Sequence, residues 1–84
     1  MNHSRAKIRL NTMAEVNAFL KAVHLASAYE ESVFYLEDFN GSRRVDANSY
    51  LGVIYASGEW QGEIYIVNAT HDGKFLAWLD PFRA

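Results

Sequence analysis

Apolar residues recur at helical spacing after residue 12, and they predict a helix over Met13–Ala28. Its buried face is expected to hold Val16, Phe19, Leu20 and Val23. Thr12 with Glu15 three residues later forms a capping box, in which a hydroxyl and a carboxylate each accept a backbone N–H of the first turn. Before this helix, apolar and basic residues alternate over Lys7–Leu10 and predict a short strand.

The next segment predicts a β-hairpin. Ser32–Phe39 is rich in strand-forming residues. Asn40-Gly41 follows and favours a two-residue type I′ turn, because both positions of that turn need a positive φ. Arg43–Ala47 is then the returning strand. Its charges at Arg43 and Arg44 are typical of an edge strand that avoids pairing with other chains, although the same pair could receive an acidic partner or a phosphate.

A second helix is expected to begin after Asn48 and Ser49, which are good N-cap residues, and to end at Gly58. Glu63–Ala69 alternates as a strand, and residues 71–73 form a turn. Residues 74–79 are expected to form one or two helical turns that stop at Asp80-Pro81.

The order of elements is therefore β-α-β-β-α-β with a short C-terminal helical tail. We expect an α+β open-faced sandwich, with a four-stranded antiparallel sheet and both helices on one face. The 84 residues suffice for one domain, 1–84, and 50% of them are hydrophobic, which can supply a core without disulfides. Several unrelated families share this order, so the order alone gives no function.

Composition narrows the function classes. The net charge of −2 argues against a general nucleic-acid binder that neutralises phosphates. Cysteine is absent, and no apolar run is long enough for a membrane span. The first residues are polar and lack the apolar stretch of a secretory signal. These features predict a cytoplasmic protein.

Two segments resemble the phosphocarrier protein HPr family. Residues 42–54, SRRVDANSYLGVI, are similar to the HPr segment around its regulatory serine, and residues 62–69, GEIYIVNA, followed by Asp72-Gly73, are similar to its last strand and turn. Asn40-Gly41 also lies where that family has a hairpin. The similarity covers roughly residues 6 to 74. It implies the HPr fold and a link to the bacterial sugar phosphotransferase system.

The same resemblance argues against phosphocarrier activity. HPr carries its phosphoryl group on a histidine that is followed by Ala-Arg-Pro. In this chain Glu15 occupies the matched histidine position, Asn17 the arginine position and Ala18 the proline position. Glu15 is interpreted as a capping residue, with a replacement phospho-acceptor as the alternative. No catalytic residue is therefore predicted, and the protein is expected not to be an enzyme.

Ser49 matches the serine that a dedicated kinase phosphorylates in relatives of the family, so it is a candidate regulatory phosphorylation site. A phosphate there would lie at a helix N-terminus, where free N–H groups favour anions. Tyr50, Leu51 and Ile54 match the face that docks partner proteins. One helix cannot bury all of these and Tyr55 as well, so at least one should be exposed.

Other candidate chemistry has simpler explanations. The carboxylate pairs Glu30-Glu31 and Glu37-Asp38 are interpreted as solvated charge rather than an acid–base pair. His3, His24 and His71 lack a second histidine at ligand spacing, so neither a metal site nor a cofactor is predicted.

Large apolar residues crowd the end of the chain, where HPr relatives have a longer helix: Phe75, Trp78, Leu79 and Phe82. Either they pack as an abbreviated helix or they leave apolar surface uncovered, which favours a homodimer.

The preferred hypothesis is an HPr-like regulatory or protein-interaction domain. One alternative is an active phosphocarrier that uses another residue. Another is a small RNA-binding domain whose Phe34, Tyr35 and Tyr65 stack bases on the sheet. The acidic net charge makes nucleic acid the less favoured partner.

Overall fold

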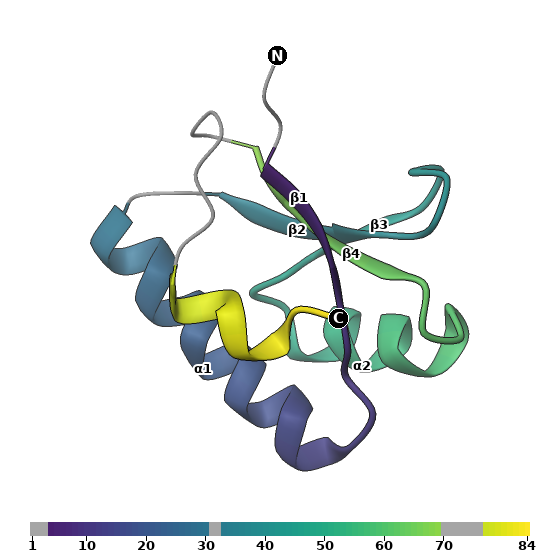
Figure 1. Ribbon diagram of the computed structural model, residues 1–84, viewed down its shortest axis with the longest axis horizontal. Coiled ribbons are helices and arrows are strands. Elements are labelled where there is room, and N and C mark those ends of the chain that lie inside the picture. The colour runs from purple at the N-terminus through teal and green to yellow at the C-terminus, as the bar shows by residue number, and fades with distance from the viewer. Residues whose placement is uncertain (1–3, 31–32, 70–76) are drawn as a thin grey trace.

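A computed structural model describes residues 4–30, 33–69 and 77–84. Its elements are β1 (Ser4–Ile8), α1 (Met13–Glu30), β2 (Phe34–Glu37), β3 (Arg44–Asp46), α2 (Tyr50–Glu59), β4 (Ile64–Asn68) and a 3-10 helix, η1 (Ala77–Phe82). The order β-α-β-β-α-β with a helical tail confirms the predicted fold class (Figure 1). Both helices lie on the same side of the sheet, and η1 lies beside α1.

The sheet has the strand order β1-β4-β2-β3, and every neighbouring pair is antiparallel. β1 and β2 are therefore parallel to each other with β4 between them, and β3 and β4 are parallel with β2 between them. Each helix connects one of these separated pairs, as in a split βαβ unit. In this order only β4 separates β1, at the start of the chain, from β2.

The core lies between the sheet and the helices. Alternate residues of β2 and β4 point towards the helices because side chains along a strand alternate between faces. They meet buried residues of both helices in one cluster, whose largest fully buried members include Phe19, Phe34, Ile8, Leu36, Ile64, Ile66, Val16, Val23 and Val53. The predicted α1 face is buried as expected.

The predicted type I′ turn at Asn40-Gly41 is wrong. Only Gly41 has a positive φ there (76°). The Asp38 N–H donates to the Arg43 carbonyl oxygen (3.2 Å), so a wider loop over residues 39–42 joins the strands. The reason lies in the Asp38 carboxylate, which accepts the backbone N–H groups of Ser42 (2.9 Å) and Arg43 (3.3 Å) and holds the wider loop together.

Several boundaries also differ from the prediction: α1 continues past Ala28 to Glu30, and β2 and β3 are shorter than expected. β1 begins at Ser4, because pairing with β4 continues to Ser4↔Asn68. α2 passes through Gly58 to Glu59, and the positive φ values that follow it fall at Gln61 and Gly62. η1 contains Pro81 instead of stopping before it. A proline keeps a helical φ and removes only one N–H donor, so a short helix tolerates it.

The C-terminal residues pair with the end of β1. The Arg9 N–H donates to the Phe82 carbonyl oxygen (2.8 Å), and the Ala84 N–H donates to the Lys7 carbonyl oxygen (3.0 Å). The Phe82 ring meets the Phe19 ring edge-on at 5.5 Å between centroids. Among the described residues, the sheet thus has β3 at one edge and, at the other, β1, whose end is bridged to Arg83.

Candidate protein-interaction site

Ser49 is the N-cap of α2. Its φ and ψ of −91° and 118° are extended, and its Oγ accepts a hydrogen bond from the Gly52 N–H at 3.1 Å. The Ser49 carbonyl oxygen accepts the first helical bond, from the Val53 N–H at 2.9 Å. The Oγ contact satisfies one of the N–H groups that a helix start leaves without partners. The hydroxyl therefore has a structural role at the position that the sequence predicts for phosphorylation.

Gly52 allows the first turn of α2 to approach β3 closely. A Cβ at this position would lie 3.1 Å from the Cβ of Val45 and 3.3 Å from that of Ser49. Both distances are shorter than ordinary van der Waals contact. The backbone of the first turn of α2 therefore packs closely against Val45 of β3.

The α2 face consists of Tyr50, Leu51, Ile54 and Tyr55. Tyr50, Leu51 and Tyr55 are 50%, 76% and 46% exposed, and Ile54 is half-buried. The prediction that at least one of them is exposed is confirmed. Tyr50 with Ile54, and Leu51 with Tyr55, are four residues apart and therefore adjacent on the helix surface. The four side chains form one apolar patch.

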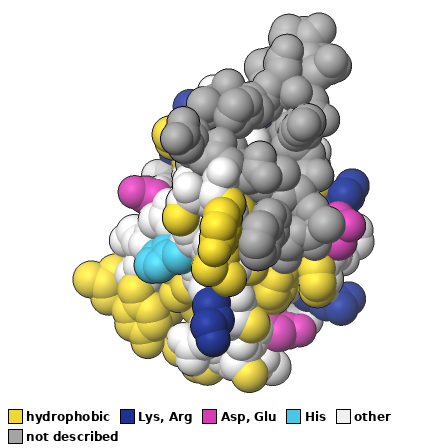
Figure 2. Space-filling model, turned by 90° about the vertical axis from the view of Figure 1, so that its left-hand side faces the viewer, with side chains coloured by type: hydrophobic (Ala, Val, Ile, Leu, Met, Phe, Trp, Pro, Cys, Tyr) yellow, Lys and Arg dark blue, Asp and Glu magenta, His cyan; other side chains and the backbone are white. Residues whose placement is uncertain are grey.

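His24 of α1 lies beside the start of this patch. Its Nε2 is 3.3 Å from the Asn48 carbonyl oxygen, and the Asn48 amide donates to the Ser27 hydroxyl at 3.2 Å. Figure 2 shows hydrophobic side chains gathered next to this histidine, drawn in cyan. His24 therefore contacts the loop before α2 and not the amino end of α1. His3 and His71 lie outside the described residues.

Glu15 forms the predicted capping box. Its N–H donates to Thr12 Oγ1 (3.1 Å), and its Oε1 accepts the N–H groups of Thr12 (3.1 Å) and Asn11 (2.6 Å). These contacts account for the carboxylate as a helix cap. Asn17 and Ala18, at the other two matched positions, are exposed on the following turn of α1.

Glu37 lies in an environment that the sequence did not indicate. Solvated charge was expected, but the residue is only 6% exposed. Its Oε2 lies 2.5 Å from Arg5 Nε, and its Oε1 lies 3.5 Å from Arg44 Nε. The alternation of β2 places Glu37 on the face away from the helices, but only the strand order brings Arg5 to it. A local sequence signal for the Arg5 contact does not exist.

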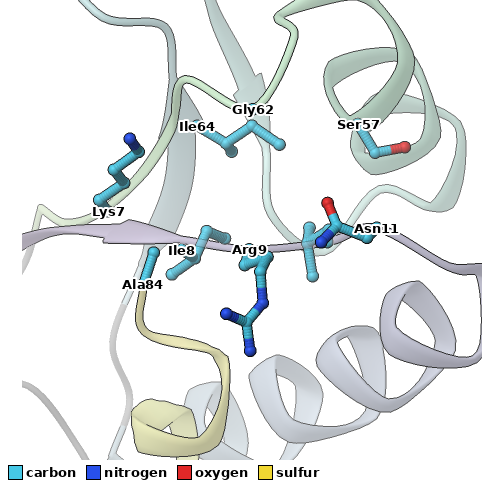
Figure 3. A pocket seen from close by; sticks show the side chains of 9 residues that line it. Lys7, Ile8, Arg9, Asn11, Ser57, Gly62, Ile64 and Ala84 are labelled. Atoms are coloured by element: carbon cyan, nitrogen blue, oxygen red, sulfur yellow. The ribbon is translucent and has the colours of Figure 1, made fainter.

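Two further features of the structure concern catalysis. Among the described residues, no group of three His, Asp or Glu side chains is placed to hold a metal ion. A hollow of about 260 Å³ lies between the end of β1, Ser57 of α2 and Ala84 (Figure 3). Its charged side chains are Lys7 and Arg9, which point in different directions, and its lining contains no carboxylate side chain that could form an acid–base pair with them.

The C-terminal apolar residues that the structure describes belong to the core. Leu79 is fully buried, and Phe82 is half-buried against Phe19. The residue Phe75 and the side chain of Trp78 lie outside the described part of the chain. Neither Leu79 nor Phe82 thus provides open surface for the predicted homodimer.

Comparisons with profiles of known protein families, with curated proteins and with solved structures find no match. Among the described helices, none combines the length and the apolar character that crossing a membrane requires.

Proposed function

We propose that this chain is an HPr-like regulatory or protein-interaction domain of the bacterial cytoplasm, related to the sugar phosphotransferase system, that binds partner proteins through the α2 face. The observation that carries the proposal is the exposed apolar patch of Tyr50, Leu51 and Tyr55. Single exposed apolar residues are ordinary, but adjacent ones on one helix are typical of an interaction site.

The charge distribution of α2 supports this role. Glu59 is the only charged residue of the helix, and it lies at the far end from Ser49. A partner can therefore cover the patch without removing a charged α2 side chain from water, which is the costly part of burying polar surface. Aromatic residues are also enriched at the centres of interfaces, as Tyr50 and Tyr55 would be here.

Ser49 is the regulatory position in this proposal. A phosphate on its Oγ would place about two negative charges at the edge of an apolar surface. The helix N-terminus favours that charge, so α2 would tolerate it. An apolar partner would not, because docking would have to desolvate the phosphate. Modification would thus act on binding rather than on folding.

Phosphocarrier activity is the less favoured alternative. The Glu15 carboxylate, which occupies the matched histidine position, is engaged by two backbone N–H groups of the cap. Incubation with phosphoenolpyruvate, the first kinase component of the phosphotransferase system and magnesium, followed by mass analysis, tests it directly. A stable added phosphate would show that the chain is a carrier.

One of the three aromatic rings expected to stack on bases in the RNA-binding alternative is not accessible. Phe34 is buried among the helices and cannot stack on a base. Tyr35 and Tyr65 do lie on the other face of the sheet, but guanidinium groups cover their rings, Arg44 at 4.4 Å from the Tyr35 centroid and Arg5 at 4.0 Å from that of Tyr65. Base stacking would have to displace both arginines.

The test is a binding titration with two purified proteins of the implied system, its first kinase component and the HPr kinase. Leu51→Asp places a charge in the most exposed part of the patch, and Phe39→Asp places the same charge on an exposed apolar position in the loop after β2, away from the α2 face. We expect at least one protein to bind the wild type and the Phe39 variant, and to lose most of its affinity for the Leu51 variant. Equal affinities for all three chains, or no binding to the wild type, contradict the proposal.

The homodimer stays a separate prediction. Light scattering during size-exclusion chromatography measures it, and a monomer at high concentration would contradict it.

A further inference from the structure

The face of the sheet away from the helices carries a charged cluster. It contains Arg5 of β1, Glu37 of β2 and Arg44 of β3, which the strand order places around one carboxylate. A hollow of about 180 Å³, called here the open-face hollow, is lined by Arg5, Tyr35, Glu37, Arg44 and Val67. Two arginines and one glutamate give this lining a formal charge of +1.

The two arginines differ in how fully they are engaged. Arg5 donates through Nε to Glu37 and through Nη2 to the carbonyl oxygens of Phe39 (3.0 Å) and Asp38 (3.4 Å). It is thus tied to the loop after β2. Arg44 has one long contact, 3.5 Å from its Nε to Glu37, and its side chain is 57% exposed. Its two terminal nitrogens make no hydrogen bond to the described residues.

Arg44 is nevertheless held in place. Its guanidinium lies over the Tyr35 ring, 4.4 Å from the centroid, and its Nε lies 3.5 Å from Glu37 Oε1. These contacts leave the two terminal NH2 groups of Arg44, which lines the hollow, without a hydrogen-bond partner among the described residues. A guanidinium fork of this kind matches two oxygens of a carboxylate or phosphate. The contacts with Tyr35 and Glu37 restrict the side chain, so less conformational entropy is lost when an anion binds.

We propose that the open-face hollow binds a small oxyanion, a phosphate or carboxylate group, through the terminal nitrogens of Arg44. The size supports a small group, since pockets for whole drug-sized ligands are about 300–1,000 Å³. A larger ligand would place only its anionic end here. This inference is independent of the α2 face, which lies on a helix at the other side of the sheet.

Neighbouring carboxylates on this side of the sheet have partners of their own. Asp46 accepts the Asn48 N–H through Oδ1 at 2.9 Å. Glu63 lies 3.5 Å from Lys7 Nζ and accepts the Tyr65 hydroxyl at 3.2 Å. Glu37 is the carboxylate within the hollow, and its charge opposes an incoming anion. Removing that charge should therefore strengthen binding.

The experiment titrates the full chain with inorganic phosphate and, separately, with acetate at constant ionic strength, and follows the Arg44 side-chain N–H and Val67 amide signals by NMR. Arg44→Lys keeps the charge but loses the fork, Glu37→Gln removes the opposing charge, and Arg43→Lys is the matched control outside the hollow. Backbone spectra of each variant report whether the sheet is retained.

We expect saturable shifts with at least one anion, and the anion that binds identifies the preferred group. Affinity should fall by about tenfold or more in Arg44→Lys, as expected for loss of one charge-assisted hydrogen bond. It should rise in Glu37→Gln and stay unchanged in Arg43→Lys. Shifts that do not saturate for either anion overturn the proposal. So does an equal loss in the Arg43 and Arg44 variants, which would indicate general attraction to basic residues.

Discussion

Replacing Ser49 by alanine is expected to destabilise the protein by about 1 kcal/mol, although the substitution removes nothing from the core. The lost group is the Oγ that accepts the Gly52 N–H at 3.1 Å. Gly52 is half-buried against β3, so water replaces this acceptor only in part. For a domain of this size, 1 kcal/mol corresponds to a fall in Tm of roughly 4–8 °C.

Ser49→Asp should behave differently. Aspartate is as good an N-cap as serine, and a negative charge at a helix N-terminus is favourable by about 0.3–1 kcal/mol. The first turn of α2 has no acidic residue that would repel it. We therefore expect a Tm close to that of the wild type. If the α2 face binds partners, this variant should still weaken docking, because its carboxylate lies next to Tyr50.

Thermal unfolding followed by circular dichroism measures the two stabilities, with Ser57→Ala as the matched control. The Ser57 hydroxyl donates to the Ile54 carbonyl oxygen (2.9 Å) within the helix, and alanine has the higher helix propensity. That control should stay near the wild-type Tm. The role of Ser49 as the cap is contradicted if Ser57→Ala is as destabilising as Ser49→Ala, or if Ser49→Asp loses as much stability as Ser49→Ala.

Three further predictions concern the core, the C-terminal segment and the hairpin loop. Val53→Ala should lower the free energy of unfolding, measured with denaturant, by about 2 kcal/mol because Val53 is fully buried. Leu51→Ala, on the exposed face, should change it by less than about 0.5 kcal/mol, and equal losses in the two variants would contradict the assigned faces. Phe82→Ala should destabilise by about 2–4 kcal/mol and increase hydrogen exchange at the Arg9 N–H, which the Phe82 carbonyl accepts; unchanged exchange would mean that the ring does not anchor this segment. Burial raises the pKa of Asp38, but hydrogen bonds from Arg43, Ser42 and Gly41 outweigh it and hold the pKa below its ordinary 3.8. The ionised form thus stabilises the fold above about pH 4, and this contribution is lost as the pH falls through the lowered pKa. Asp38→Asn should therefore lose less stability than the wild type below pH 4. Parallel plots of unfolding free energy against pH for the two proteins would refute the assignment.

Local signals predicted several features well. The capping box of Thr12 and Glu15 and the cap at Ser49 depend on groups three residues apart. Covalent geometry fixes such distances once a helix begins, so the spacing alone predicts the contact. The burial of the α1 face follows from the same periodicity. The exposure of the α2 face could be predicted only in part, since the pattern shows that some residues must be exposed but not which ones.

The loop at Asn40-Gly41 illustrates how a strong local signal can fail. The pair favours a two-residue turn, but the Asp38 carboxylate accepts hydrogen bonds from the N–H groups of Ser42 and Arg43 and stabilises a wider loop. Arg5 adds to this from another strand, by donating to the Asp38 and Phe39 carbonyl oxygens. The turn type was therefore decided by contacts that the dipeptide does not contain.

The order of helices and strands, the two helix caps and the apolar side of α1 can be predicted from the amino-acid pattern, because each depends on contacts within about one turn or on a repeat along one element. The placement of Arg5, Glu37 and Arg44 around one hollow follows only from the folded sheet, since these residues come from three strands and meet only through the order β1-β4-β2-β3. The burial of Leu79 likewise depends on the folded structure, because it requires η1 to pack beside α1.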